Sequence, residues 1–335
     1  MKKIATKITL ADIAREARVG VATVDRVLNK RAAVKESTAL RVLEAARRLG
    51  FTLEQPHYRL AAGKAPVTIR MGFILLQESH SFYLPLARAL TREAAPWLPA
   101  GQAPVILHFA IDAGDEVEVL GLVALDHPLI RHAVARAAAR GVRVLTLLSD
   151  LSVPQRSGYI GLDNHKAGRT AAWFIERLCR GNGEIGIIIG DNRFTCQESC
   201  EISFRSCLRE QGKGQQILEP VRSHERADIA RTVTEQMLTQ YPALQAIYAP
   251  CGGVEGIVDA LRDSGRQQEI ALVCHGPLSD SELALIDGTI DIMLNHRLDE
   301  FAAVTLRAMA NAASRPHSEV ISLPQPFDII TKENM

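Results

Sequence analysis

Residues 8–50 constrain this chain most, because three short amphipathic helices are predicted there in close succession. In the first, apolar side chains recur at helical spacing at Leu10, Ile13, Ala14 and Ala17. After a break at Arg18-Val19-Gly20, a second set follows at Val21, Val24, Val27 and Leu28. A third helix, Thr38 to Leu49, is expected to bury Leu40, Val42, Leu43, Ala46 and Leu49. Two helices joined by so short a turn predict a helix-turn-helix, whose second helix can enter the major groove of DNA.

Charge is divided unevenly along the chain. Residues 1–64 hold 14 Lys and Arg against 6 Asp and Glu, a net of +8, whereas the formal charge of the whole chain is +1. Residues 65–335 therefore carry a net of −7. A basic segment beside an acidic body is the electrostatic pattern expected of a part that binds phosphates.

The segment TLADIAREARVGVATVDRVLN resembles the N-terminal signature of the LacI (lactose-repressor-like) transcription regulators. The positions that carry the resemblance are Thr9, Leu10, Asp12, Ala14, Val19, Thr23, Val24, Arg26, Val27, Leu28 and Asn29. The resemblance continues as an alternating βα pattern over nearly all 335 residues. It implies a helix-turn-helix domain at 1–53, a hinge or linker at 54–66, and an effector-binding and dimerisation domain at 67–335.

By this resemblance, a recognition helix runs from about Val21 to Asn29. Val21 and Ala22 are expected to face base edges, where apolar groups can contact a thymine methyl. The other expected DNA contacts are Thr9, Thr23, Arg26, Asn29 and, from the linker, Leu60. Leu60 is a candidate wedge for the minor groove, and a flexible tether is the alternative for this stretch.

Two residues of the turn depart from the family pattern. Gly20 stands where relatives often have a Ser N-cap, and Gly caps a helix less well by a few tenths of a kcal/mol. Arg18 stands where relatives often have Gly, so a positive φ there would cost about 1 kcal/mol. Asp25 stands where Ser is frequent, and it either pairs with Arg26 or accepts from a cytosine amine.

In the remaining chain, short β-rich apolar runs alternate with helical stretches, which predicts parallel sheets flanked by helices. The runs are 69–77, 104–110, 119–125, 142–148, 157–162, 184–190, 244–250, 269–275 and 289–295. The helical stretches are 84–95, 129–139, 166–178, 198–209, 226–239, 254–263 and 298–312. The predicted fold is an all-α head plus an α/β body resembling periplasmic binding proteins, with two parallel-sheet subdomains at about 67–158 with 290–320 and 162–287 with 325–335.

One connection in this pattern is too short. Only residues 111–118 separate the second and third predicted strands, whereas a parallel crossover usually needs about a dozen residues or more. Family members usually have a helix there, so the first subdomain is expected to have an incomplete layer or an altered edge.

Polar and aromatic side chains follow the predicted strands, where parallel sheets place their binding groups. The candidate effector-binding residues are Phe82, Tyr83, Asp126, His127, Asp150, Asn192, Arg193, His275 and His296, with His80 beside them. Such a set suits a sugar or polyol. By comparison with the family, Cys200 stands where a sugar-binding Arg is common, Ala249 where an Asn is common, and Gly276 or Pro277 where an acidic residue is common. Asp150 keeps its match. An atypical ligand or a degenerate sensor is therefore expected.

Other classes of protein have little support in the sequence. The segment 251–256, CGGVEG, lacks the dinucleotide-binding pattern, and the six cysteines include neither CxxC nor zinc spacing. No nucleophile elbow, phosphate loop, signal peptide or membrane-length apolar run is apparent.

We predict a cytoplasmic regulator without enzyme activity or cofactor, with repression favoured. It would bind a pseudo-palindromic operator as a homodimer. The alternatives are a solute-binding or enzymatic α/β protein with an incidental helical cap, or a regulator whose sensing pocket has degenerated.

Overall fold

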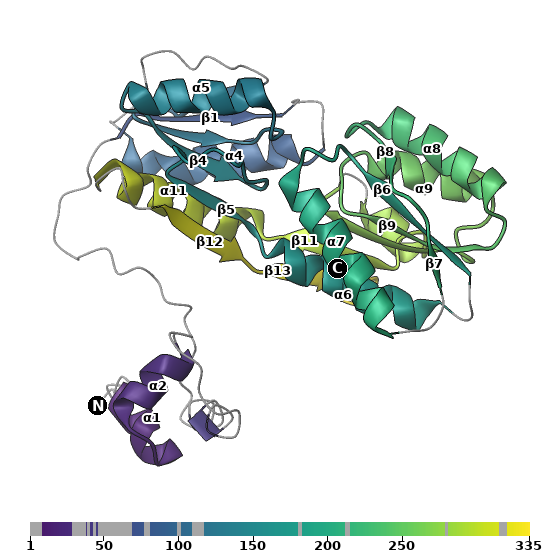
Figure 1. Cartoon of the computed structure of the whole chain (residues 1–335), viewed down its shortest axis with the longest axis horizontal. Helices are drawn as coiled ribbons and strands as arrows, with labels where there is room; N and C mark the ends of the chain where they lie inside the picture. The colour runs from purple at the N-terminus through teal and green to yellow at the C-terminus, as the bar shows by residue number, and fades with distance from the viewer. Residues whose placement is uncertain are drawn as a thin grey trace, which may run out of the picture. The chain divides into compact units, whose positions relative to one another are not determined.

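The computed structural model divides the chain into two compact units, Met1–Ala65 and Pro66–Met335, here called the head and the body. It describes residues 9–28, 38, 41–42, 45, 69–76, 81–98, 102–108, 117–179, 183–211, 215–278, 281–314 and 320–335. Figure 1 shows both units, with many of their helices and strands labelled.

The head contains the predicted pair of helices, α1 (Leu10–Ala17) and α2 (Val21–Leu28). Ile13 and Val24 are fully buried between them, as the helical spacing of apolar residues predicts. Val42 and Ala45 are helical and join the same core, which supports the third predicted helix. Leu40, Leu43, Ala46 and Leu49 lie outside the described residues.

The first lobe of the body is a parallel sheet in the order β12-β5-β4-β3-β1-β2. Its strands are β1 (Met71–Leu75), β2 (Val105–His108), β3 (Val119–Leu122), β4 (Arg143–Leu147), β5 (Gly158–Leu162) and β12 (Ile321–Gln325). Its helices are α4 (Tyr83–Ala94), the 3-10 turn η1 (Ala95–Trp97), α5 (Pro128–Ala139) and α11 (Leu298–Ser314). Figure 1 shows α5 on one face of this sheet and α4 with α11 on the other.

The second lobe is a sheet in the order β13-β11-β10-β9-β6-β7, with β8 also paired to β6. The strands are β6 (Glu184–Ile189), β7 (Gln216–Ile217), β8 (Val221–Arg222), β9 (Leu244–Ala249), β10 (Ala271–Gly276), β11 (Ile292–His296) and β13 (Phe327–Ile330). The helices are α6 (Asn164–Leu178), α7 (Thr195–Gln211), α8 (Ala227–Gln240), α9 (Val254–Asp263) and α10 (Ser281–Ile286). Only β13 runs antiparallel to its neighbour among the described strand pairs.

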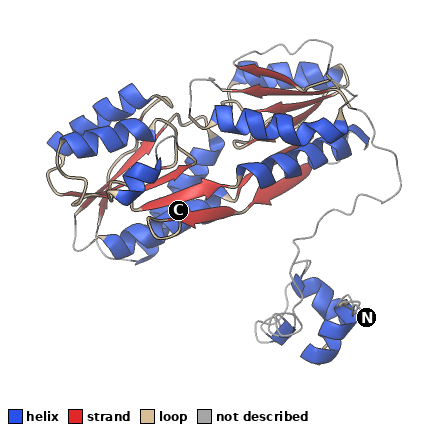
Figure 2. Ribbon diagram, turned by 180° about the vertical axis from the view of Figure 1, so that it is seen from behind, coloured by secondary structure: helices blue, strands red, loops and turns tan. Residues whose placement is uncertain are grey.

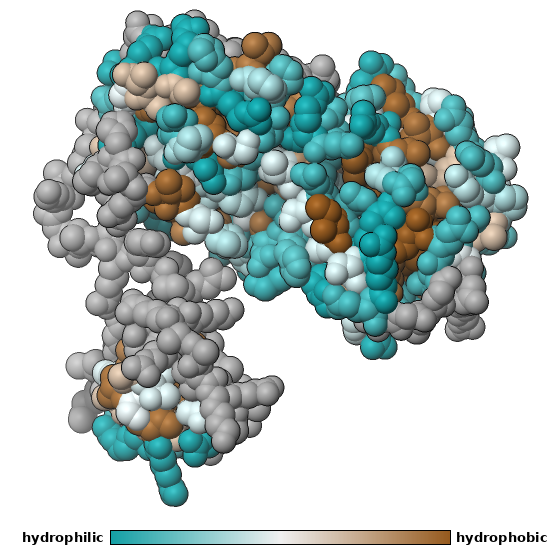
Figure 3. Space-filling model, viewed as in Figure 1, coloured by the Kyte–Doolittle hydropathy of each residue, from teal (hydrophilic) through white to brown (hydrophobic). Residues whose placement is uncertain are grey.

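Each sheet is covered on both faces, so each lobe has two apolar layers. In the first lobe, Phe73 and Leu145 pack with α4 and α11, while Ile74 and Val144 pack with α5. Residue alternation along the strands sends successive side chains to opposite layers. Figure 2 shows the same two lobes from behind, with helices outside the strands. On the visible face in Figure 3, apolar residues are interspersed among hydrophilic ones.

The chain passes between the lobes after Leu162, after His296 and at Pro326. The second passage lies later than the expected 287–290, because Ile292–His296 pairs with β10 and β13 in the second lobe. The third falls at Pro326, within the expected 320–326, and Ile321–Gln325 belongs to the first lobe because it pairs with β5. The first subdomain is therefore corrected to end at Gln325, and the second passage is corrected to follow His296.

The structure confirms that the connection between β2 and β3 is short, since β2 ends at His108 and β3 begins at Val119. Most of it, 109–116, lies outside the described residues, so the expectation of an altered layer there remains a prediction. The predicted runs also omitted α10 and the strands β7, β8, β12 and β13, whose short length gives little periodic signal.

Candidate functional site

The first helix of the head begins at a capping box. Thr9 Oγ1 accepts a hydrogen bond from Asp12 N at 3.3 Å, and Thr9 N donates to Asp12 Oδ2 at 2.9 Å. Hydrogen bonds from Thr9 lower the pKa of the Asp12 carboxyl. The Thr9 hydroxyl also donates to Asp12 at 2.6 Å, so this predicted DNA contact has a structural role in starting α1.

The turn between α1 and α2 is tight and contains the predicted strained residue. Arg18 has a φ of 53°, in the left-handed region, where a non-Gly side chain costs about 1 kcal/mol. Val19 N donates to Ala14 O at 3.0 Å and closes α1. Thr23 N then donates to Gly20 O at 2.9 Å, which starts α2 at once.

The start of α2 presents a free surface. Val24 is buried in the head, whereas Val21 is 48% exposed and Ala22 is also exposed. Thr23 is half-buried. The side chain of Arg26, and the whole of Asn29 and Leu60, lie outside the described residues. This exposed N-terminal turn is the part of a recognition helix that meets base edges in helix-turn-helix proteins.

In the body, a small cavity of about 90 Å³ lies between the lobes. Four residues predicted from sequence line it: Phe82, Tyr83, His275 and His296. Cys200, Gly276 and Pro277, which the family comparison aligned with ligand-binding positions, also line it. Sequence reasoning missed the rest of its wall: Leu148, Asn164, Cys196, Gln197, Glu225, Pro250, Cys251, Gly252 and Leu278.

Two neutral histidines form part of the wall. Burial lowers the pKa of His275 to about 3, with a smaller effect from His296, and burial lowers the pKa of His296 to about 4. His275 Nε2 lies 3.0 Å from Tyr248 Oη, and the Phe82 ring packs edge-on against His296 at 5.2 Å between centroids. His296 Nδ1 is buried without a hydrogen-bond partner among the described residues. Such an atom is available to a ligand.

The cavity wall also carries one carboxylate and several thiols. Glu225 accepts hydrogen bonds from Gln197 Nε2 at 2.8 Å and from Gly252 N at 3.1 Å. Burial raises the pKa of the Cys196 thiol to about 12 and also raises that of Cys200. Both thiols are therefore protonated at neutral pH, and this wall is less polar than one carrying an arginine.

Local backbone strain places Glu225 in the wall. His224 and Glu225 have φ values of 52° and 61°, a conformation that non-Gly residues rarely adopt. Ser223 N donates to Ile189 O at 2.7 Å and ties the loop to the end of β6. Gly190 follows β6, and a Cβ there would collide with the Glu225 carboxylate. Gly190 therefore leaves the space that the Glu225 side chain occupies, a contact between distant positions that no local sequence pattern indicates.

Direct hydrogen bonds join the two lobes. Ser81 Oγ in the first lobe donates to Glu255 Oε1 of α9 at 2.5 Å. Thr195 Oγ1 in the second lobe donates to Asp150 O of the first at 2.8 Å. The lobes therefore lie close together around the cavity.

The other predicted residues lie outside the cavity wall and pair with neighbours. Asp150 accepts two hydrogen bonds from Arg156, at 2.7 and 2.9 Å. The remaining pairings are Asp126 with Ser152 (2.7 Å) and Arg131 (3.3 Å), Asn192 with Arg222 (3.0 Å), and Arg193 with Asp191 (3.0 Å). Hydrogen bonds from Arg193 lower the pKa of Asp191 to about 2.

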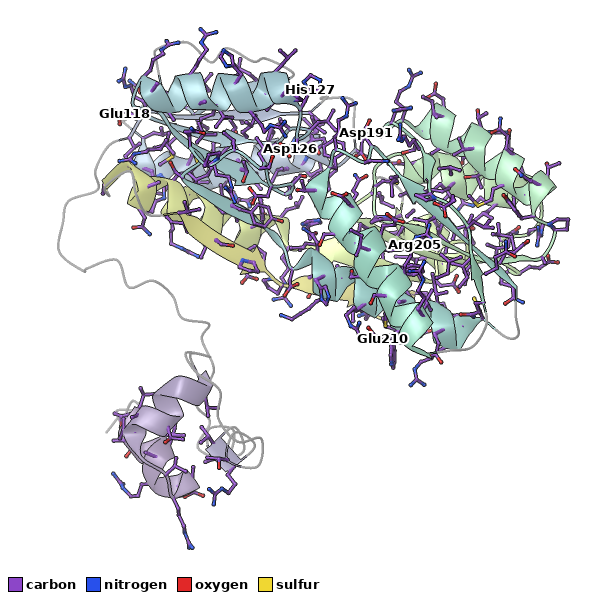
Figure 4. All side chains as sticks on the ribbon, viewed as in Figure 1. Glu118, Asp126, His127, Asp191, Arg205 and Glu210 are labelled. Atoms are coloured by element: carbon purple, nitrogen blue, oxygen red, sulfur yellow. The ribbon has the colours of Figure 1, made fainter. Side chains whose placement is uncertain are left out.

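Figure 4 labels Asp126 and His127 at the end of α5 and Asp191 in the neighbouring lobe. His127 accepts a hydrogen bond from Leu129 N at 3.2 Å and caps α5. His80 lies outside the described residues. Among the described residues, no cluster of three or more potential metal-binding side chains is present. None of the described helices combines the length and the apolar run needed to span a bilayer.

Comparison with known families matches both units. The model of the periplasmic binding protein domain matches residues 90–315, and the model of bacterial regulatory proteins of the lacI family matches residues 9–53. Catabolite control protein A of Priestia megaterium is 42% identical over 83 residues, 25% of this chain and 24% of that protein. The HTH-type transcriptional regulator RegA of Clostridium acetobutylicum is 26% identical over 146 residues, 44% of this chain and 41% of that protein. The matched part thus spans less than half of either relative.

Solved structures share the fold of the body. A glucose-galactose binding protein, GanP, from Geobacillus stearothermophilus has a TM-score of 0.67 at 18% identity, covering 79% of this chain and 99% of that one. A solute binding protein from Bacillus halodurans C-125 with bound myo-inositol has a TM-score of 0.69 at 15% identity, covering 81% and 97%. The chain therefore belongs to the family with a periplasmic binding protein domain, and it carries a LacI-family helix-turn-helix domain at its N-terminus.

Proposed function

We propose that this protein is a sequence-specific DNA-binding transcription regulator, with repression favoured, controlled by a small effector in the cavity between the lobes. One observation carries the proposal: the exposed turn of α2, with Val21 and Ala22, lies in a segment that matches the lacI family model. A relative named as an HTH-type transcriptional regulator, RegA, matches over 44% of this chain and supports the same class. The role is binding rather than catalysis.

The proposed effector is a small uncharged sugar or polyol. The cavity wall offers His296 Nδ1 and neutral thiols, and its carboxylate, Glu225, already accepts two hydrogen bonds. Neutral donors and acceptors beside Phe82 and Tyr83 suit hydroxyl groups over an apolar ring face. Similar folds with bound myo-inositol or D-fucose support this class. At about 90 Å³ the cavity is well below the roughly 300 Å³ of common ligand sites, so binding of a hexose requires some opening of the lobes.

The effector controls DNA binding if its affinity differs between two relative arrangements of the lobes. A molecule in this cavity contacts both lobes, so its differential affinity shifts their relative angle. In the proposed cytoplasmic homodimer, that shift changes the spacing of two heads on a pseudo-palindromic operator. Sedimentation at micromolar concentration tests the dimer, and a stable monomer or tetramer contradicts it.

DNA binding is tested with sequences selected from a random library by the full chain. Selected DNA should bind more tightly than scrambled DNA, and affinity should fall steeply as salt rises. Arg26→Ala is expected to weaken binding. Ala22→Gln should change the preferred bases, whereas Ala11→Gln, at an exposed position of α1, is the matched control.

A lack of any sequence preference, or equal effects of Ala22→Gln and Ala11→Gln, would overturn the proposed recognition surface. The first of these results favours the alternative, a solute-binding protein with a helical cap.

For the effector, thermal unfolding of the full chain is measured with myo-inositol, hexoses and pentoses. A ligand at 100 times its Kd should stabilise the body by about 2.7 kcal/mol.

A further inference from the structure

A second cavity, of about 370 Å³, lies inside the first lobe beneath α5. Its floor consists of aliphatic side chains of β1 and β3, among them Ile74 and Leu122. Its roof is the inner face of α5, including Ile130, Ala133 and Ala137. Ile74 and Leu122 on the floor are each only 6% exposed, whereas Leu129 at the rim is 67% exposed, so this is a recess with a buried apolar floor that opens to solvent.

The topology of the lobe explains this space. The sheet order places β1 between β3 and β2, and α5 lies on the face opposite α4 and α11. A helix between β2 and β3 would share that face with α5, but this link is shorter than a usual crossover. Among the described helices, α5 alone packs on this face. The side chains of β1 and β3 therefore meet a single helix.

Among the described residues, charged and polar side chains line the cavity only at the end near the second lobe. They belong to His127 and Arg193. His127 Nδ1 accepts from Leu129 N, so in the neutral ring Nε2 carries the proton and is a donor. Arg193 donates through Nε and Nη2 to Asp191, and its Nη1 has no partner among the described residues.

No charge at this end is left uncompensated among the described side chains. Arg193 pairs with Asp191 at 3.0 Å, and Arg131 pairs with Asp126 at 3.3 Å. An anionic ligand would add a third negative charge to two balanced pairs, at a desolvation cost. A sugar would leave most of its hydroxyls against hydrocarbon without hydrogen bonds. The chemistry fits a ligand with an apolar body and a single neutral acceptor.

We propose that this cavity is a second ligand site, separate from the effector cavity, for a neutral and largely hydrocarbon or aromatic molecule with one oxygen acceptor at its end. Apolar cavities near 150 Å³ hold benzene, so 370 Å³ accommodates roughly a dozen non-hydrogen atoms. The acceptor lies at His127 and Arg193. Asp126 N donates to Arg193 O at 2.8 Å across the lobes, so an occupant contacts a lobe–lobe junction.

The test is calorimetric titration of the full chain with 4-phenylbutan-2-one, a soluble neutral ketone, and with its anionic counterpart 4-phenylbutanoate. The ketone should bind saturably at one molecule per chain, and the anion about tenfold or more weakly. Ala133→Leu places a side chain in the cavity and should abolish binding of the ketone. Ala139→Leu, on the exposed face of the same helix, is the matched control and should leave it unchanged.

A second filling variant, Ala137→Met, guards against misfolding of the first, and a retained melting temperature shows that each variant folds. Three results would each overturn the proposal. The first is no saturable binding of the ketone to the parent chain. The second is equal affinity in Ala133→Leu, Ala137→Met and Ala139→Leu. The third is tighter binding of the anion than of the ketone.

Discussion

Replacement of Asp150 by Ala is expected to destabilise the body by about 2–4 kcal/mol. The Asp150 carboxylate accepts from Arg156 Nε at 2.7 Å and Nη2 at 2.9 Å, from Thr146 Oγ1 at 2.6 Å, and from Leu151 N at 2.8 Å. Its side chain is 29% exposed and that of Arg156 is 24% exposed. This one side chain therefore links Thr146 of β4 to Leu151 and Arg156 of the loop that follows.

The expected loss of stability follows from the hydrogen bonds that each partner of Asp150 loses. Bidentate hydrogen bonds between charged groups contribute about 1.5–3 kcal/mol each when buried, and partial exposure reduces that value because water replaces the lost partner. Thr146 keeps a second acceptor, Gly158 O at 3.0 Å, so it is not left unsatisfied. Arg156 keeps only Val153 O, at 3.2 Å.

Urea unfolding followed by tryptophan fluorescence measures the effect. Both tryptophans, Trp97 and Trp173, belong to the body, so the signal is not mixed with unfolding of the head. The control is Asp263→Ala, which removes an ion pair to Arg231 from a side chain that is 61% exposed and should cost about 0–1 kcal/mol. If Asp150→Ala costs no more than this control, the structural role argued for Asp150 is refuted.

Three further outcomes are expected. In the folded protein the pKa values of His275 and His296 lie near 3 and 4, below the ordinary 6.5, so unfolding takes up protons in acid. The urea midpoint should be constant above pH 6.5 and should fall as the pH is lowered from 6.5 toward 4. A midpoint that does not change over this range contradicts their burial as neutral rings. Gly168→Ala would place a Cβ against Cys200 O where α6 meets α7 and should lower stability by about 1–3 kcal/mol in the same assay. Arg18→Gly should stabilise the head by up to about 1 kcal/mol, read from circular dichroism melts, and destabilisation would contradict the left-handed turn.

Much of the fold was predictable because its signals are local. The spacing of Ile13, Ala14 and Ala17 and the Thr9–Asp12 cap act within one or two helical turns, so the sequence identifies α1 directly. The alternation of strands and helices similarly predicted both sheets. The positive φ of Arg18 was raised only as a condition, from the Gly that relatives often have at this position, and the structure shows it.

The cavity was predicted only in part. Strand ends pointed to Phe82, Tyr83, His275 and His296, because parallel strands bring their C-terminal ends to one edge. The same reasoning did not distinguish these four residues from Asp150 and Arg193. Both also follow strands, but they lie outside this cavity, where Asp150 pairs with Arg156 and Arg193 with Asp191. Glu225 was missed because it follows a two-residue strand and a strained loop that have no periodic pattern.

The sequence by itself determined the head, its tight turn and the α/β class of the body, since helix spacing, capping and strand alternation act between near neighbours. Tertiary structure alone decided which strand each passage between lobes follows, which polar side chains neutralise one another, and where space remains. Ser81 meets Glu255 across 174 positions of sequence, and the cavity beneath α5 depends on a layer formed by β1, β3 and α5 together. Such contacts follow from the packing of whole elements, because no local pattern specifies which distant surfaces meet.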